Sequence, residues 1–294
     1  MISIIIVSYN ASELLLRCIN FCRSLKTIPQ TPDFEVIVVD NNSSDNAQDY
    51  VTRTYPDVIW KQNDRNLGFA AAVNQGLNIA EGDYFLLLNP DSEISSNALA
   101  ALTSFWSHHP DAGIVGGKIV NSDGTFQKQC RRNFPEPASA FFRLFKLEIL
   151  FPNHRLKHSY ERDLDDIETL HEVDAVAGAF MCFPRTLTEE IGMFDEGYFL
   201  MGEDLDFCHR AKLAGKKVFY YPEVRIVHHH GASRQTRLFT SYLNGHHAMI
   251  RYFRKFLRQK YSRLSAGLVY TGIVLHCVSL SAFSLLKFPF RRSR

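Results

Sequence analysis

Asp91 is the first residue whose position in the sequence points to chemistry. It follows an unbroken apolar run, residues 84–88 (YFLLL), and is preceded by Asn89 and Pro90. These three residues are also typical of a simple turn, because Pro fixes φ and Asn and Asp favour turn positions. A carboxylate directly after a buried strand is held rigidly, however, and one or two carboxylates plus substrate phosphates are the usual ligands of Mg²⁺. Asp91 is therefore a candidate metal ligand.

A second acidic pair, Glu203 and Asp204, follows an aromatic and apolar approach, GYFLMG. Acids in the first turn of a helix complement its dipole, and Asp206 with Arg210 would make an i,i+4 pair, so one interpretation is structural. The other is a general base, because a carboxylate in a cleft can take a proton from an attacking hydroxyl. A helix N-terminus weakens a carboxylate as a base, and the like charge of Glu203 would compensate.

Three consecutive histidines, residues 228–230, follow an apolar run. Alternation along an extended chain would place His228 and His230 on one side and His229 on the other. At least one of them is expected to be an ordinary solvated side chain. A neutral imidazole that completes the metal site of Asp91 is the sharper hypothesis.

Three further segments offer groups for a nucleotide. Asp40 ends the run EVIVVD and could accept a hydrogen bond from a pyrimidine N–H, or the Asp, Asn and Ser residues there could simply cap the next helix. Residues 66–77 (NLGFAAAVNQGL) place Gly68 ahead of a small-residue helix, where a ligand can approach the backbone and anions are favoured. An ordinary helix entry would look similar, and the segment is not a GxGxxG fingerprint.

The elements that must position these groups alternate between strands and helices. Apolar runs at 2–7, 35–39 and 84–88 predict strands, and residues near 12–26, 45–54 and 67–80 carry apolar residues at helical spacing. This pattern predicts an α/β fold with a mostly parallel sheet covered on both faces. Ligands of such sheets gather beyond the carboxyl ends of the strands. The polar clusters that fall there are Ser8-Tyr9-Asn10, Asp40-Asn41-Asn42 and Asn89-Pro90-Asp91.

The second half is less regular. Residues 130–172 mix Pro, aromatic and charged residues and are interpreted as a long excursion, a lid or an acceptor loop. The segment 202–215 predicts a helix that Gly215 closes, and strands are expected at 216–222 and 224–230.

Composition restricts the function classes. The 294 residues have 46% hydrophobic content, ample for a core, and a net charge of only +2, so no overall field favours nucleic acid. Six cysteines without CxxC spacing indicate reduced thiols in a cytosolic protein. The start, ISIIIV, lacks the basic region of a signal peptide. A nicotinamide-dependent oxidoreductase is disfavoured, because SYNAS stands where its glycine fingerprint would follow the first strand.

The C-terminal part predicts contact with a membrane. Residues 251–263 hold six Arg or Lys and no acid, and residues 264–286 carry no charged side chain over about the 20 residues that span a bilayer core. A helix that spans or lies on the membrane is the preferred interpretation, and a docked core helix is the alternative. We therefore expect a catalytic domain at 1–240 and a membrane-associated helical region at 241–294, at the cytoplasmic face of the plasma membrane.

Taken together, the motifs resemble the inverting glycosyltransferases of family 2, which have the GT-A fold, and among them the rhamnosyltransferase-like branch of bacterial cell-surface glycan synthesis. The resemblance covers about residues 1–235. It rests on seven motifs in order: IIVSYN, VIVVDNNSSD, NLGFAAAVNQGL, LLLNPD, GAFMCFPR, FDEGYFLMGEDLDFCHRA and VRIVHHHGAS.

The resemblance implies roles for named residues. Asp204, with Glu203 beside it, would be the catalytic base, and Asp91 and His228 would bind Mg²⁺ or Mn²⁺ on the donor diphosphate. Asn89 replaces the first acid of the family's DxD motif, which puts strict metal dependence in question. The nucleotide would be held by Ser8, Tyr9, Asn10, Asp40, Asn66, Gly68, Phe69 and Asn89.

The reaction implied is transfer of a sugar from a nucleotide diphosphate to a hydroxyl of a lipid-linked or glycan acceptor. The best guess for the donor is dTDP-rhamnose, and UDP-sugars come next. The alternative is a non-catalytic subunit on the same fold that binds a nucleotide sugar or a carbohydrate.

Overall fold

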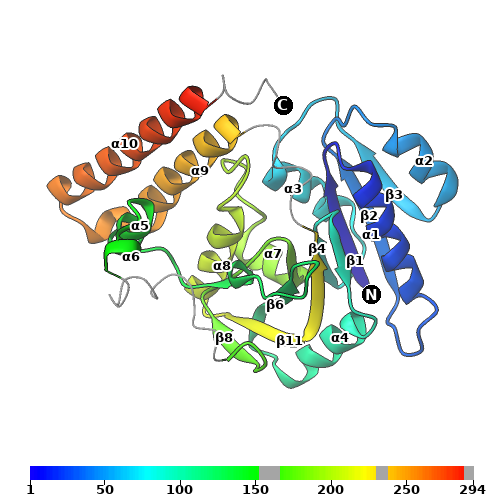
Figure 1. Ribbon diagram of the computed structural model, residues 1–294. Helices are drawn as coiled ribbons and strands as arrows, with labels where there is room; N and C mark the ends of the chain where they lie inside the picture. Colours follow the sequence, from blue (N-terminus) through cyan, green and yellow to red (C-terminus); the bar gives the residue numbers. More distant parts are fainter. Residues whose placement is uncertain (152–165, 230–237, 288–294) are drawn as a thin grey trace.

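The computed structural model describes residues 1–151, 166–229 and 238–287, and its centre is one mixed sheet (Figure 1). The nine strands follow the order β3-β2-β1-β4-β10-β6-β11-β5, with β8 paired to β11. Their bounds are β1 (Ile2–Ser8), β2 (Phe34–Asp40), β3 (Val58–Gln62), β4 (Tyr84–Leu88), β5 (Ser92–Ile94), β6 (Ala112–Val120), β8 (His171–Val173), β10 (Phe180–Pro184) and β11 (Lys217–His228). Strands β1–β4, β6 and β11 point one way, so the predicted, mostly parallel α/β sheet is confirmed.

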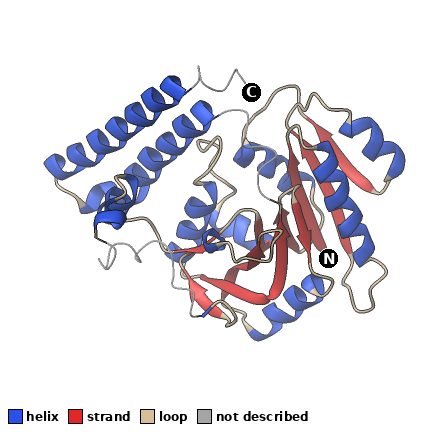
Figure 2. Cartoon of the chain, viewed as in Figure 1, coloured by secondary structure: helices blue, strands red, loops and turns tan. Residues whose placement is uncertain are grey.

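Helices cover both faces of this sheet (Figure 2). They are α1 (Ser12–Leu25), α2 (Ala47–Thr54), α3 (Phe69–Ile79), α4 (Ala98–His108), α7 (Arg185–Ile191) and α8 (Glu203–Leu213). The helix α8 ends just before Gly215, which has a φ of 78° as a closing glycine requires. All seven residues of β1 are buried, as a strand between two helical layers must be.

Strand β6 was not predicted, because its glycines interrupt the apolar run AGIVGGKIV. They are needed for close packing. A Cβ on Gly116 would lie 2.5 Å from Cβ of Val176, in the short strand β9 (Ala175–Val176). Gly116 therefore lets β9 cross close over the central sheet, which brings the turn after β9 to the sheet's polar edge.

The predicted strands 216–222 and 224–230 are one strand, β11, and its pairing with β6 shifts register between Tyr221 and Arg225. Pro222 lies inside the shift, where its missing N–H is tolerated. Beyond the shift β11 also pairs antiparallel with β5, in the register Ile226↔Ile94 and His228↔Ser92.

The excursion is partly folded. It contains β7 (Arg131–Arg132), which pairs with β9, and the helices α5 (Pro137–Leu144) and α6 (Leu147–Leu150), while residues 152–165 of the predicted loop lie outside the described part.

Helices α9 (Leu238–Tyr252) and α10 (Arg263–Lys287) lie side by side at the end of the molecule opposite β3 and α2 (Figure 1). A π-helical turn, Phe253–Leu257, continues α9. Three ion pairs fasten this region to the part of the chain that holds the sheet: Arg251 to Asp195 at 2.5 Å, Lys255 to Asp195 at 2.9 Å, and Lys255 to Asp206 at 2.6 Å. The burial of Phe253 and Leu257 in the main hydrophobic cluster adds apolar contact to these pairs.

Candidate active site

The polar residues predicted at strand ends do gather at one edge of the sheet. Ser8 and Asp40 are directly paired in the parallel β1–β2 register. Strand β4 pairs with β1 on the other side, so Asn89 follows β4 at the same edge. Asn10 joins the β2 end through two hydrogen bonds, one from its N–H to Ser43 Oγ and one accepted by its side-chain oxygen from Ser44 N–H.

Asp91 and His228 lie in contact. The β5–β11 register sets His228 opposite Ser92, and the His229 N–H donates to the carbonyl of Asp91 at 2.8 Å. Asp91 Oδ1 is 2.9 Å from His228 Nε2, and Asn89 Nδ2 is 3.3 Å from the same nitrogen. His229 points away, with Nε2 at 2.9 Å from Glu93 Oε1, and His230 lies outside the described residues.

A chain of side chains fixes the tautomer of His228. Asp123 Oδ1 accepts from Thr125 Oγ1 at 2.6 Å, and Thr125 Oγ1 accepts from Asn121 Nδ2 at 2.7 Å. Asn121 Oδ1 in turn accepts from Gln127 Nε2 at 2.7 Å. The remaining amide atom, Gln127 Oε1, is 3.1 Å from His228 Nδ1, which must therefore carry the hydrogen.

This chain leaves the Nε2 lone pair facing the carboxylate of Asp91. Two electron-rich atoms so close require a proton or a metal ion between them, and carboxylate plus imidazole are ordinary ligands of Mn²⁺. No cluster of three or more His, Cys, Asp or Glu suited to a metal occurs among the described residues. A divalent ion held by this pair would have to take its other ligands from substrate phosphates and water.

Asp204 lies at the start of α8, behind Gly202, whose φ is 93°. It is 8% exposed. Its Oδ2 accepts from the N–H of Gly178 at 3.1 Å and from Arg132 Nη2 at 2.5 Å. Sequence reasoning missed Arg132, which arrives on β7. The Arg-Arg pair at 131–132 was the available signal, since neighbouring arginines in a strand cannot both face the same side.

Glu203, next to Asp204, is a buried acid whose pKa is strongly raised. Burial, and next the charge of Asp204, raise the pKa of Glu203 to about 8. Its Oε2 has no hydrogen-bond partner among the residues described. At neutral pH the Glu203 side chain is therefore mainly the uncharged acid.

The turn 177–179, between β9 and β10, connects the two acidic centres. Gly178 donates its N–H to Asp204, and the carbonyl of Ala179 accepts from the N–H of Asn89 at 3.0 Å. Asn89 in turn contacts His228. One short turn thus joins the Asp91–His228 pair to Asp204.

Asn66, Gly68 and Phe69 border the same region. Asn66 Oδ1 accepts from the N–H of Gly68, whose φ is 89°, and the N–H of Phe69 donates to the Phe199 carbonyl at 2.7 Å. A Cβ on Gly68 would lie 2.6 Å from that carbonyl oxygen, and one on Gly178 would lie 3.7 Å from the Phe69 ring. Only glycine fits at position 68, whereas a Cβ at position 178 would make an ordinary van der Waals contact.

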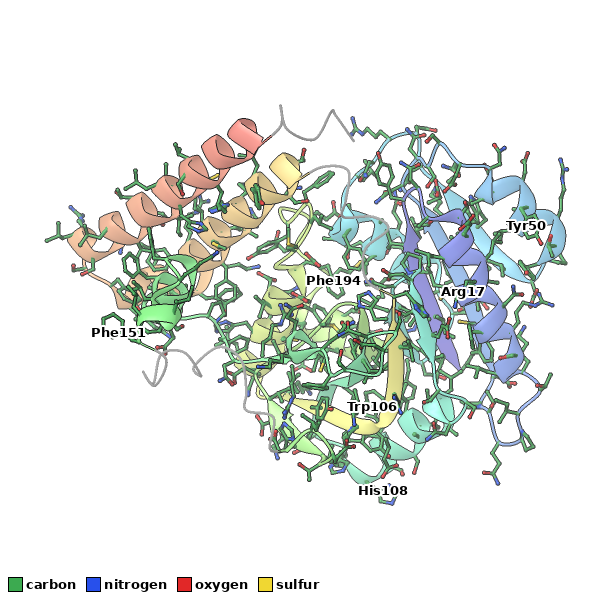
Figure 3. All side chains as sticks on the ribbon, viewed as in Figure 1. Arg17, Tyr50, Trp106, His108, Phe151 and Phe194 are labelled. Carbon is green, nitrogen blue, oxygen red and sulfur yellow. The ribbon has the colours of Figure 1, made fainter. Side chains whose placement is uncertain are left out.

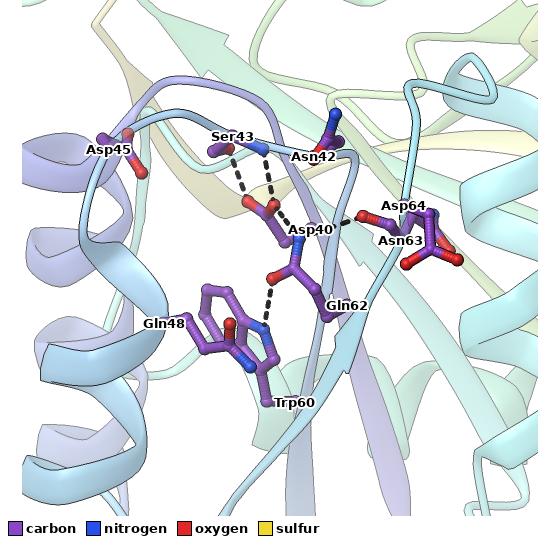
Figure 4. Close-up of a pocket in the computed structure, with 9 residues that line it drawn as sticks. All are labelled: Asp40, Asn42, Ser43, Asp45, Gln48, Trp60, Gln62, Asn63 and Asp64. Atoms are coloured by element: carbon purple, nitrogen blue, oxygen red, sulfur yellow. Dashed lines mark hydrogen bonds between the residues drawn. The ribbon is translucent and has the colours of Figure 1, made fainter.

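Asp40 is buried against a cavity of about 390 Å³ at the ends of β2 and β3 (Figure 4). Its Oδ1 accepts from Ser43 N–H and Gln62 Nε2, and its Oδ2 accepts from Ser43 Oγ. A carboxylate has about four acceptor positions, so Oδ2 can still take one more donor. Trp60, which donates to Gln62 at 3.0 Å, supplies an aromatic wall that the sequence analysis did not identify.

Comparison with known proteins identifies the family of the chain. Residues 3–185 match the profile of glycosyl transferase family 2. The N-acetylglucosaminyl-diphospho-decaprenol L-rhamnosyltransferase of Mycobacterium tuberculosis is 27% identical over 258 residues, 83% of this chain and 80% of that protein. The low-salt glycan biosynthesis hexosyltransferase Agl10 of Haloferax volcanii is 25% identical over 82% of this chain and 71% of its own length.

Solved structures share the fold. The mannosyltransferase PcManGT from Pyrobaculum calidifontis, in complex with GDP-Man and Mn²⁺, superposes with a TM-score of 0.57 at 18% identity, over 99% of this chain and 81% of that one. TarS of S. aureus, residues 1–349, gives a TM-score of 0.53 at 18% identity, over 99% and 75% of the two chains. Since the family profile covers more than half of the sequence, the chain belongs to glycosyl transferase family 2.

Proposed function

We propose that this protein is a metal-dependent, inverting glycosyltransferase that moves a sugar, L-rhamnose from dTDP-rhamnose as the best guess, to a hydroxyl of a lipid-linked or glycan acceptor. One observation carries the proposal: the turn 177–179 joins an Asp–His pair suited to a cation to a separate buried carboxylate, Asp204. A rhamnosyltransferase whose name specifies a diphospho-decaprenol substrate is among the relatives, which supports this donor and acceptor class.

The donor would lie along the polar edge. Asp40 and the cavity beside it would receive the nucleoside, with Ser8, Tyr9 and Asn10 at the adjoining end of β1. Gly68 and Phe69 would let the diphosphate pass close to the backbone at the start of α3. Asp91 and His228 would hold Mg²⁺ or Mn²⁺, which, when bound, supplies Lewis-acid stabilisation of the departing diphosphate.

Asp204 would remove the proton from the acceptor hydroxyl. The freed oxygen attacks the anomeric carbon from the side opposite the diphosphate, so the configuration inverts and no covalent enzyme intermediate forms. Glu203 would stay protonated beside it, so that the pair carries one negative charge rather than two.

Arg132 has a role in this scheme because it binds Oδ2 of the base, Asp204. A carboxylate held by a guanidinium is a weak base. The diphosphate of the donor is a competing anion that arginine binds well. We infer that donor binding draws Arg132 from Asp204, so that the base becomes effective only when the donor is present.

The first prediction concerns the base. Asp204→Asn should lower turnover by roughly 10²-fold or more, because proton removal is lost, and should not weaken nucleotide binding, because Arg132 stays free to bind the diphosphate. Glu203→Gln is the matched control and should retain most activity, since glutamine imitates the protonated acid. Release of nucleoside diphosphate is measured with membrane lipid extract as acceptor. Near-normal turnover in Asp204→Asn, or an equal loss in Glu203→Gln, would show that the base is assigned wrongly.

The second prediction concerns the side chains behind the metal pair. Gln127→Met keeps the volume but cannot hold His228 Nδ1–H, so the affinity for Mn²⁺ should fall by about 10- to 100-fold. Electron paramagnetic resonance of free Mn²⁺, recorded with and without dTDP, measures this without any turnover. The control is Gln62→Met, at the nucleoside cavity. Its affinity for Mn²⁺ in the absence of dTDP should equal that of the wild type. Equal Mn²⁺ binding by Gln127→Met and the wild type would exclude this role.

The third prediction uses Glu203 and pH. Its native pKa of about 8 lies above the ordinary value of 4.5, so the native state holds a proton that the unfolded state releases between these pH values. The contribution of Glu203 to the free energy of unfolding is fully present below pH 4.5 and is lost as the pH rises toward 8. Glu203→Gln should therefore match the wild type near pH 5 and exceed it at pH 8.5 in urea unfolding. If the free energies of unfolding of the two proteins changed in parallel with pH, the raised pKa of Glu203 would be refuted.

A further inference from the structure

The outward face of α10 is apolar, although the exposed face of a helix in water is normally polar. Leu264, Leu268, Leu275 and Val278 lie on one stripe and are 77%, 67%, 60% and 60% exposed. The opposite side, with Ala266 and Ile273, is buried. A helix of a soluble protein turns its polar side outward, so the exposed stripe indicates that something covers it.

A second apolar segment lies at the same end of the molecule. In α6 and just after it, Ile149, Leu150 and Phe151 are 72%, 70% and 55% exposed. The ring of Phe145, between α5 and α6, lies 5.8 Å from that of His276 in α10. Figures 1 and 3 show α6 with Phe151 beside the α9–α10 pair, away from the central sheet. We call the exposed apolar residues of α10 and 149–151 together the apolar surface.

The charge of this part of the chain is one-sided. Residues 224–294 contain 13 Lys or Arg and no Asp or Glu. The whole chain has 33 basic and 31 acidic residues. The first 223 residues therefore carry 20 basic and 31 acidic residues, a net charge of −11. Arg254, Lys260 and Arg263 are exposed between α9 and α10, at the start of the apolar stripe. An apolar surface edged by cations complements anionic lipid.

The packing of α10 indicates how it would meet a bilayer. Residues Arg263–Ser281 are long and apolar enough to span, with a mean hydropathy of 1.6. However, α10 packs along α9, where His246 Nε2 and His276 Nδ1 are 2.9 Å apart. Since Arg251 and Lys255 tie α9 to the catalytic half, a spanning α10 would have to leave its partner. Keeping this packing on α9 therefore favours an α10 that lies along the membrane.

We propose that the apolar surface docks on an anionic phospholipid bilayer, with α10 lying in the interface and α6 entering beside it. The surface therefore combines two segments far apart in sequence. Docking is independent of the reaction, and it would hold the sheet's polar edge near substrates in the membrane.

Vesicle flotation of the full chain tests this without any enzyme assay. Vesicles of phosphatidylcholine with phosphatidylglycerol should bind the protein, and pure phosphatidylcholine or high salt should weaken binding. Ile149→Asp with Leu150→Asp, and separately Leu268→Asp with Leu275→Asp, should each lower binding at least tenfold. The control is Leu213→Asp, equally exposed at 71% but on α8, which should bind normally. All these sites are exposed, so folding is retained and is checked by circular dichroism.

Several results would overturn the proposal. Unchanged binding of the Ile149/Leu150 variant would remove α6 from the surface. Failure to bind either vesicle, with a dimer in sedimentation, would assign the surface to a second copy. An Arg294→Cys variant tests the orientation of α10 in intact protoplasts. It should resist an impermeant maleimide added outside, and labelling from outside would mean that α10 spans the membrane.

Discussion

The antiparallel pairing of β5 with β11 is the constraint on which the site depends. It sets His228 opposite Ser92, and so brings the imidazole of His228 against the carboxylate of Asp91. Neither residue could be moved by one position, because a shift of one residue in a strand turns its side chains to the other face. His229 illustrates this, since it points to Glu93 and Ser122 instead.

Two irregular segments orient this pair and connect it to Asp204. The loop 121–127 orients the imidazole through a chain of hydrogen bonds that begins at Asp123 and ends at Gln127. The turn 177–179 connects the pair to Asp204, and Gly116 of β6 allows β9 to approach closely enough to position that turn. The regular sheet supplies the edge, and the irregular segments supply the orientation of individual side chains.

This division also explains what could be predicted from the sequence. The strands ending at Ser8, Asp40 and Leu88 show clear apolar runs, so their common edge and the groups on it were predictable. The match of His228 to Asp91 was also predicted. Gln127, Arg132 and Gly178 were not, because each lies outside periodic segments and acts through a partner distant in sequence. Strand β6 was missed because glycines required for packing interrupt its pattern.

The central claim is that Asp91 and His228 together hold the cation that serves the donor diphosphate. Anomalous diffraction at the manganese edge, from crystals grown with Mn²⁺ and dTDP, tests it most directly. Our account predicts one strong peak bonded to Asp91, to Nε2 of His228 and to phosphate oxygen. A peak that contacts neither side chain, or nucleotide bound without any peak between them, would contradict it.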